Sequence, residues 1–290
     1  MKLVIDIGSN TSKCLLAEKT SIGLNKLFEL SLENRISAGS GKLVDNASDM
    51  IADAIKKFIF EAKKFSASFT ITAVATSALR EAIEGKDVAK KASATCGVDV
   101  KILSGEEEAK YAYLGAMSDS SIPYCNHNAF FDLGGGSLEI VFGAANVQNI
   151  FSLPIGAVVL TKAFCKDEVI SLQAKKEMEV FLETQIAKID CPKPEILVGA
   201  GGAVVAARLM NEKINGKQSN KITIAEIERF IEILLPMSVE TRAERFGIAR
   251  NRADIIVPAF LCITALAKRL NKAEIFHTFH NLRYGLILNE

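Results

Sequence analysis

A short motif of aspartate, glycine and hydroxyl residues occurs twice in the chain, each time between two runs of apolar residues. The first copy reads Asp-Ile-Gly-Ser-Asn-Thr at residues 6–11, and the second reads Asp-Leu-Gly-Gly-Gly-Ser at residues 132–137. An internal repeat of a strand, a glycine turn and a second strand indicates two structurally equivalent domains.

The rest of each half alternates between helix and strand patterns. Apolar residues at helical spacing predict helices over residues 46–65, 105–117, 172–189, 203–210, 224–235 and 253–270, with a further helix after residue 77. Short apolar runs predict strands at residues 3–5, 14–17, 26–31, 70–74, 98–103, 129–131, 138–142, 147–153, 196–198 and 274–278. This order indicates an α/β fold with mixed sheets.

A polar loop at residues 118–128 marks the expected domain boundary. We expect a first domain over residues 1–120 and a second over residues 121–278. The C-terminal segment, residues 279–290, is expected to pack back on the first domain.

The composition excludes several classes of protein. The 290 residues include 35 lysines and arginines against 34 acidic residues, so the net charge favours neither nucleic acid nor an anionic membrane as a partner. The longest apolar stretch, residues 255–267, contains Pro258 and is shorter than the about 20 residues that span a bilayer. Six cysteines form no C-x-x-C pair and have no histidine cluster nearby, so we expect reduced cysteines, structural histidines and no zinc. We therefore expect a soluble, cytoplasmic protein.

The glycines of the two turns are suited to phosphate binding. Glycine lets the backbone approach a ligand closely, and successive N–H groups in such a turn form an anion-binding concavity. Asp6 and Asp132 would repel phosphate, so we expect Mg²⁺ between these carboxylates and the ligand. Ordinary hairpins are the alternative, which the paired occurrence disfavours. The predicted phosphate-binding positions in the turns are Gly8, Ser9, Asn10, Thr11, Gly134, Gly135, Gly136 and Ser137.

Three consecutive glutamates follow Ser104 at the start of a predicted helix. Ser104 and Glu107 fit a capping box, and Glu106 fits a solvated residue that complements the helix dipole. Glu108 has no capping role, and its carboxylate could orient a water molecule beside a phosphate. Because acidic first turns are common, the residues alone leave a structural and a catalytic role for Glu108 equally open.

Two isolated arginines and a third glycine turn are further candidates. Arg80 and Arg283 could each bind phosphate oxygens through two hydrogen bonds, although a lone arginine is more often a surface residue. The glycine turn at residues 199–202 lies between a predicted strand and helix. It is equally consistent with phosphate binding and with tight packing.

These segments together resemble the exopolyphosphatase and guanosine pentaphosphate phosphohydrolase (Ppx/GppA) family in its short two-domain form. The resemblance covers nearly the whole chain and is carried by residues 6–11, 75–82, 102–109, 132–139 and 152–158. It implies two actin-like, ribonuclease H-like domains with a cleft between them. It also implies removal of terminal phosphate from polyphosphate or pppGpp with Mg²⁺. The family precedent favours a homodimer, while the sequence leaves the oligomeric state open.

The resemblance also implies roles for individual residues. Glu108, immediately before the alanine of the Glu-Glu-Ala segment, corresponds to the family's catalytic glutamate. Asp132 and Glu139 correspond to its acidic residues near the metal and the phosphate. Lys13 stands where the family has arginine, and so keeps the charge without the planar fork. The C-terminal motif Ser-Asp-Gly-x-Leu-Arg-Glu-Gly reads Thr-Phe-His-Asn-Leu-Arg-Tyr-Gly at residues 278–285, which retains Arg283 and neither acidic residue.

The resulting prediction is a phosphoanhydride hydrolase in which Mg²⁺ assists, and Glu108 orients the attacking water. Two alternatives stay open. An ATP-dependent phosphotransferase of the same fold would need an adenine pocket and an acceptor-activating aspartate. A non-catalytic sensor of polyphosphate or nucleotide is supported by the altered C-terminal motif. The sequence does not decide between polyphosphate and pppGpp, because the basic candidates Lys13, Arg35 and Lys42 are dispersed.

Overall fold

The structure is a computed structural model that describes residues 1–21, 23–39, 41–123, 125–144, 146–190, 193–216 and 218–289. The chain divides into two compact units. Unit 1 comprises Met1–Ser118 and His280–Glu290, and unit 2 comprises Asp119–Phe279. Each unit is described by itself.

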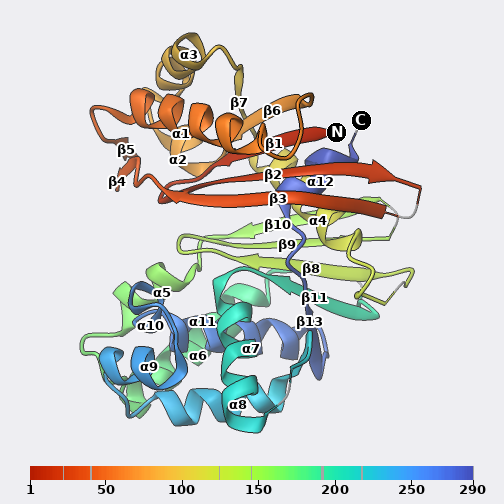
Figure 1. The fold of residues 1–290 in the computed structure, drawn as a ribbon. Helices are drawn as coiled ribbons and strands as arrows, with labels where there is room; N and C mark the ends of the chain where they lie inside the picture. The colour runs from red at the N-terminus through yellow and green to blue at the C-terminus, as the bar shows by residue number, and fades with distance from the viewer. Residues whose placement is uncertain are drawn as a thin grey trace. The chain divides into compact units, whose positions relative to one another are not determined.

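Unit 1 contains a five-stranded mixed sheet in the order β3-β2-β1-β6-β7 (Figure 1). The strands are β1 (Lys2–Ile7), β2 (Thr11–Thr20), β3 (Gly23–Glu33), β6 (Thr70–Ala75) and β7 (Val100–Ile102), and a separate short pair is β4 (Ser37–Gly39) and β5 (Lys42–Leu43). The first three strands form an antiparallel meander, and β6 and β7 continue the sheet in parallel with β1.

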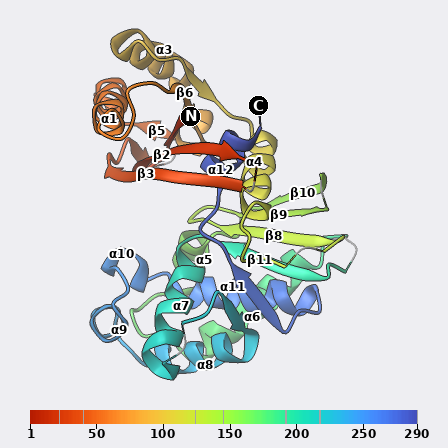
Figure 2. The same cartoon turned by 45° about the vertical axis from the view of Figure 1, so that its right-hand side comes forward.

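Helices cover both faces of this sheet (Figure 2). They are α1 (Ala47–Ala62), α2 (Ser77–Glu81), α3 (Gly85–Cys96), α4 (Gly105–Met117) and α12 (Leu282–Leu288). Side chains alternate along a strand. Leu3 and Ile5 therefore pack with the α1 side, whereas Val4 packs with residues of α12. The same alternation places Asp6 on the same face of the sheet as Val4.

Unit 2 contains a six-stranded mixed sheet in the order β10-β9-β8-β11-β13-β12. The strands are β8 (Asn128–Leu133), β9 (Leu138–Gly143), β10 (Val147–Leu153), β11 (Ile196–Ala200), β12 (Lys221–Thr223) and β13 (Glu274–His277). The helices are α5 (Ala157–Phe164), α6 (Leu172–Ile186), α7 (Gly202–Asn215), α8 (Ile224–Leu234), α9 (Val239–Phe246), α10 (Arg250–Ala253) and α11 (Ile256–Arg269).

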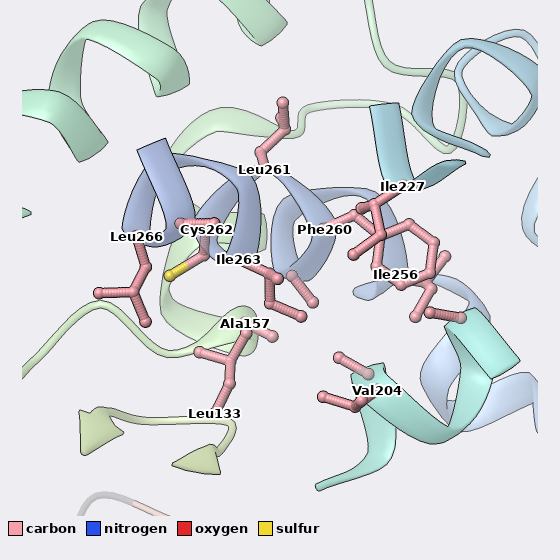
Figure 3. Close-up of a cluster of buried hydrophobic side chains, with 14 of the residues drawn as sticks. Leu133, Ala157, Val204, Ile227, Ile256, Phe260, Leu261, Cys262, Ile263 and Leu266 are labelled. Carbon is pink, nitrogen blue, oxygen red and sulfur yellow. The ribbon is translucent and has the colours of Figure 1, made fainter. Parts of the chain in front are cut away.

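The core of unit 2 is built around α11, whose residues are almost all buried. Figure 3 shows Phe260 and Ile263 of α11 in one cluster with Leu133 of β8, Ala157 of α5 and Val204 of α7. The sequence predicted a single helix over residues 253–270, and the structure has a break between α10 and α11. Pro258 explains the break, because proline has no N–H to donate to the Asp254 carbonyl four residues back and its ring would clash with that carbonyl.

The two sheets repeat one topology. In each, three antiparallel strands are followed by two strands parallel to the first. Asp6 and Asp132 occupy the same position, next to last in β1 and β8, and face Lys13 and Glu139 on the neighbouring strand. The predicted α/β fold with mixed sheets is confirmed.

The five described cysteines are free thiols, and Cys191 lies outside the described residues. No described helix combines the length and the apolar character that crossing a membrane requires.

Candidate functional site

The first glycine turn, between β1 and β2, has its carbonyl groups held inside the protein. The Asn10 carbonyl accepts from the backbone N–H groups of Asn34 and Arg35 at 3.0 and 3.1 Å. The Ser9 carbonyl accepts from the N–H of Ser37 at 3.3 Å. Among the described residues, the N–H groups of Ser9 and Asn10 have no acceptor in the protein. A turn with occupied carbonyls and open N–H groups is suited to binding an anion.

The second turn, residues 134–136 between β8 and β9, is held in the same way by the start of α5. The three glycine carbonyls accept hydrogen bonds at 2.9–3.2 Å from the N–H groups of residues 156–159. Gly156 must lack a side chain here, because a Cβ would collide with the Gly135 backbone. Within the described chain, the N–H groups of Gly135 and Gly136 have no protein acceptor. This turn also presents open N–H groups.

Each turn is closed by an equivalent hydrogen bond. The N–H of Gly8 donates to the Thr11 carbonyl at 3.2 Å, and the N–H of Gly134 donates to the Ser137 carbonyl at 3.0 Å. A Cβ on Gly8 would lie 2.9 Å from the Thr11 oxygen, so this position requires glycine. The two predicted phosphate-binding motifs therefore share backbone geometry as well as sequence.

Glu108, in the first turn of α4, forms an ion pair with Arg80. Its Oε2 atom lies 2.7 Å from Arg80 Nη1, which also donates to the Leu103 carbonyl at 3.1 Å. The predicted capping box is present, since Glu107 N–H donates to Ser104 Oγ and Ser104 N–H donates to the Glu107 carboxylate. The Glu108 side chain is 31 % exposed, so its carboxylate is open to water while Glu107 serves as a cap.

Asp6 lies close enough to these groups for their charges to affect its ionisation. Burial raises the pKa of Asp6 to about 6, although the positive charges of Arg283 and Lys13 act to lower it. The negative charge of Glu108 also contributes to this increase. The two cations therefore do not fully compensate the burial of the carboxylate. A further positive charge would stabilise its ionised form.

Arg283 is buried, and its guanidinium contacts groups of unit 1. Its Nη2 atom lies 2.8 Å from Glu29 Oε1, and Nη1 donates to the Cys14 carbonyl at 3.1 Å. Burial alone would raise the pKa of Glu29, but Arg283 and Lys26 lower it below its usual value. Only 4 % of the Arg283 side chain is exposed. The guanidinium thus joins α12 to the sheet, and phosphate binding by Arg283 stays a prediction.

Two carboxylates of unit 2 lie side by side on neighbouring strands. Asp132 on β8 is directly opposite Glu139 on β9, and Ser152 Oγ on β10 donates to Glu139 Oε1 at 3.2 Å. Like charges directly opposite each other are destabilising in a sheet. A cation at this position would offset that repulsion.

The third glycine turn packs against the same aspartate. A Cβ on Gly201, whose φ is +93°, would lie 2.7 Å from Asp132 Oδ1. A Cβ on Gly202 would collide with the guanidinium of Arg252. Both glycines are thus required for close packing, Gly201 against Asp132 and Gly202 against Arg252. The sequence left packing and phosphate binding equally open for this turn, and the structure supplies the packing reason.

The acidic residues fit Mg²⁺ better than a metal enclosed by protein ligands. Among the described residues, no group of three or more His, Cys, Asp or Glu side chains could hold a metal. Mg²⁺ commonly uses one or two carboxylates together with waters and substrate phosphates. The Asp132–Glu139 pair of unit 2 matches that donor set.

Several residues that support the site were not predicted. Asn34 and the α5 N-terminus fix the two turns, and neither carries a sequence signal of its own. Asn34 also donates through its side chain to Ser12 Oγ, inside the unit. Arg252 lies in Arg-Asn-Arg, a pattern that is typical of surface helices. These partners become apparent only when distant segments are brought together.

Comparison with known proteins finds similarity over nearly the whole chain. The sequence profile of the Ppx/GppA phosphatase family matches residues 15–290. Exopolyphosphatase 1 of Mycobacterium leprae is 27 % identical over 306 aligned positions, which cover 99 % of this chain and 88 % of that protein.

Solved structures with the same fold include the Aquifex aeolicus member of the Ppx/GppA family. It matches with a TM-score of 0.90 at 24 % identity, covering 99 % of this chain and 96 % of its own. An exopolyphosphatase from Cytophaga hutchinsonii gives a TM-score of 0.85 at 21 % identity, with coverage of 99 % and 96 %. The ethanolamine utilization protein EutJ of Carboxydothermus hydrogenoformans gives 0.50 at 13 % identity, covering 100 % and 89 %.

Proposed function

Because the chain belongs to the Ppx/GppA phosphatase family and has its actin-like α/β fold, we propose that it releases terminal orthophosphate from inorganic polyphosphate or from pppGpp. The observation that carries the proposal is the accessible Glu108 carboxylate, held by Arg80 near Asp6 and the first glycine turn. The similarity to an exopolyphosphatase supports polyphosphate as one substrate.

Phosphate is held mainly by backbone groups in this proposal. In unit 1 the open N–H groups of Ser9 and Asn10 are available to donate to phosphate oxygens, and in unit 2 those of Gly135 and Gly136 are available in the same way. Phosphoryl transfer depends on positioning and charge neutralisation more than on covalent chemistry, so such groups supply much of what the reaction needs. Lys13, half-buried beside the first turn, adds a positive charge.

Glu108 orients the attacking water. Arg80 engages Oε2, which leaves Oε1 to accept a hydrogen bond from water. In the described chain, only Nη1 of the Arg80 guanidinium has protein acceptors, so its other N–H groups can donate to a phosphate oxygen. One ion pair thereby positions both the nucleophile and the anion.

Asp132 and Glu139 of unit 2 would hold Mg²⁺, and Asp6 of unit 1 is a separate carboxylate candidate. When bound, this ion neutralises charge on the transferring phosphoryl group. The equivalent positions in the two sheets differ, because Asp6 faces Lys13 whereas Asp132 faces Glu139. The pair in unit 2 is therefore the stronger site for a cation.

A phosphate-release assay with polyphosphate and with pppGpp, each with and without Mg²⁺, tests the proposal. We expect Mg²⁺-dependent release from at least one of them. Transfer of phosphate from ATP to an acceptor, without release from either substrate, would identify a phosphotransferase. Tight binding without any turnover would identify a sensor.

A further inference from the structure

A pocket in unit 2 is lined by the segment that follows α5 and by residues of α9 and α10. Its volume is about 620 Å³, within the usual range of about 300 to 1,000 Å³ for pockets that hold drug-sized ligands. Figures 1 and 2 both show α9 next to α10 in unit 2. None of the positions that the sequence predicts to bind phosphate or metal lines this pocket.

One buried arginine connects the walls of the pocket. Arg242 on α9 has no exposed surface, and its Nε atom donates to the Leu234 carbonyl at the end of α8, at 3.0 Å. Its Nη1 and Nη2 atoms donate to the carbonyls of Ala253 and Glu168 at 3.2 and 3.0 Å. The Glu168 carboxylate also accepts from the N–H of Val239, the first residue of α9, at 3.4 Å. The end of α10 and the segment after α5 are thus both fixed to α9.

The charged side chains that line the pocket do not neutralise one another by direct contact. They are Lys166, Asp167, Glu168, Arg250 and Asp254. Within the described part of the chain, none of these five forms an ion pair. Burial lowers the pKa of Arg242, whereas Cys165, Glu168 and Asp254 act to raise it. Together with Arg242, three positive and three negative side chains surround the pocket, so a ligand without net charge keeps this balance.

A small zwitterion is complementary to this lining. The Arg250 guanidinium can bind a carboxylate through two hydrogen bonds, and the Asp254 carboxylate can accept from an ammonium group. These two residues are four positions apart around the short helix α10, so their Cβ atoms are about 6 Å apart. The ends of an extended dipeptide are separated by a similar distance, about 7 Å. Ile170, which is buried, and Val239, which is half-buried, supply apolar surface for aliphatic side chains.

Helix α5 has the pocket at one end and the second glycine turn at the other. Thr161 and Cys165, at its C-terminal end, line the pocket. At its start, the N–H groups of residues 156–159 donate to the carbonyls of residues 134–136. The eight residues of this helix span about 12 Å. A ligand in the pocket therefore contacts the same element that supports the turn.

We propose that this pocket binds a dipeptide-sized zwitterion, with its carboxylate on Arg250, its ammonium group on Asp254 and its aliphatic part on Ile170 and Val239. The bound ligand restrains the C-terminal end of α5 and thereby stabilises the turn at residues 134–136. Binding to the pocket does not depend on the proposed function, because Arg250 and Asp254 are not among the predicted phosphate-binding residues.

Calorimetric titration of the full-length protein with leucyl-leucine tests the binding step. The N-acetyl form of this dipeptide lacks the ammonium group, and its C-terminal amide lacks the carboxylate. We expect each capped form to bind at least tenfold more weakly than leucyl-leucine, the scale of one lost hydrogen bond between charged groups. Equal affinity for the three compounds, or no binding of leucyl-leucine, would overturn the site.

Two variants assign the contacts to individual residues. Arg250→Ala is expected to weaken leucyl-leucine binding about tenfold and to remove its advantage over the amide. Asp254→Asn is expected to remove its advantage over the N-acetyl form. Arg229→Ala is the matched control, because Arg229 is exposed on α8 and does not line the pocket. Circular dichroism checks that each variant is folded, and unchanged affinity in both pocket variants would overturn the assignment.

Cys165 reports on the pocket in the wild-type protein. It is a free thiol in the pocket lining, whereas Cys96 is a free thiol in unit 1. Leucyl-leucine is expected to slow alkylation of Cys165 by iodoacetamide severalfold and to leave alkylation of Cys96 unchanged, as measured by mass spectrometry. Equal rates at Cys165 with and without bound dipeptide would show that the ligand lies elsewhere.

Hydrogen exchange tests the effect on the turn. Saturating leucyl-leucine is expected to slow exchange of the amides of residues 156–159 severalfold and to leave the amides of β1 unchanged. Unchanged exchange at residues 156–159 would overturn the link through α5. None of these measurements uses phosphate release. A protein that binds the dipeptide and hydrolyses neither phosphate substrate therefore refutes the proposed function and keeps this site, and the reverse result refutes this site alone.

Discussion

Glu108 and Glu106 are separated by only two positions and differ in their surroundings. Glu108 is paired with Arg80 near Asp6, whereas Glu106 is an exposed first-turn acid. Glu108→Gln keeps the shape and removes the charge that orients water, so we expect kcat to fall by about 100-fold or more. Glu106→Gln is the control and should retain activity. Steady-state kinetics and circular dichroism on both variants check this, and near-normal turnover by Glu108→Gln contradicts the role.

Asp6 links stability to pH. Its pKa is raised from 3.8 to about 6 in the folded protein, so the folded state holds the extra proton between these values. Below about pH 4, burial of Asp6 therefore does not lower the free energy of unfolding. Above about pH 6 the buried carboxylate is ionised, and it lowers the free energy of unfolding by its full amount. We expect Asp6→Asn to raise the Tm at about pH 8, by the equivalent of roughly 1 to 3 kcal/mol, and much less at about pH 4.5. An equal increase in Tm at both pH values would contradict the conclusion that burial of the Asp6 carboxylate is not fully compensated.

Some side-chain contacts could be predicted from the sequence and others could not. Ser104 and Glu107 form the predicted capping box, because its partners are three residues apart. The ion pair between Arg283 and Glu29 was not predicted, because the two residues are distant in sequence and no pattern identifies them as partners. Local chemistry can be predicted from spacing, whereas burial of an ion pair depends on the finished fold.

At the scale of elements, α5 acts as a support for a phosphate-binding turn. Its first N–H groups occupy the carbonyls of residues 134–136, and Gly156 makes the approach possible. Gly156→Ala should displace the turn and weaken phosphate binding about tenfold or more, because a methyl group cannot be accommodated beside the Gly135 backbone. Gly105→Ala is the control, since a Cβ there has no neighbour within 4 Å. Affinity for pyrophosphate, measured by calorimetry, should change only in Gly156→Ala.

The predicted elements were accurate where periodicity was long or the signals were strong. Helix α4 has the predicted bounds, because Ser104 begins it with a cap. Helix α5 was missed, since it has eight residues and its first turn contains two β-branched valines with weak helical preference. Strand β12 was missed for a similar reason, as its three residues are too few to show alternation. Elements defined mainly by tertiary contacts leave little trace in sequence.

At the scale of the whole molecule, the two units share one topology but differ at equivalent positions. Lys13 in unit 1 corresponds to Glu139 in unit 2, opposite Asp6 and Asp132 respectively. The same backbone position thus faces a lysine in unit 1 and a second carboxylate in unit 2. The repeat could be predicted from the two glycine motifs, whereas this difference became meaningful only once the strand registers were known.

Unit 1 is completed by the last residues of the chain, after the chain has passed through unit 2. Helix α12 packs against α4, where a Cβ on Gly285 would collide with the Tyr111 carbonyl and a Cβ on Gly115 with the Asn281 carbonyl. Leu286 and Ile287 of α12 are buried against β1 and β2. We expect Gly285→Ala to destabilise unit 1 by about 2 to 4 kcal/mol, because neither helix backbone can move without opening this core.

Hydrogen exchange can localise that effect. Amides of β1 and β2 should exchange faster in Gly285→Ala, while amides of α11, in the separate core of unit 2, should be unchanged. Asn289→Ala is the control, since Asn289 reaches the Tyr111 hydroxyl only at 3.4 Å from an exposed position. Uniformly faster exchange in both units would mean that they unfold as one cooperative body, and unchanged exchange in β1 would mean that α12 contributes little to unit 1.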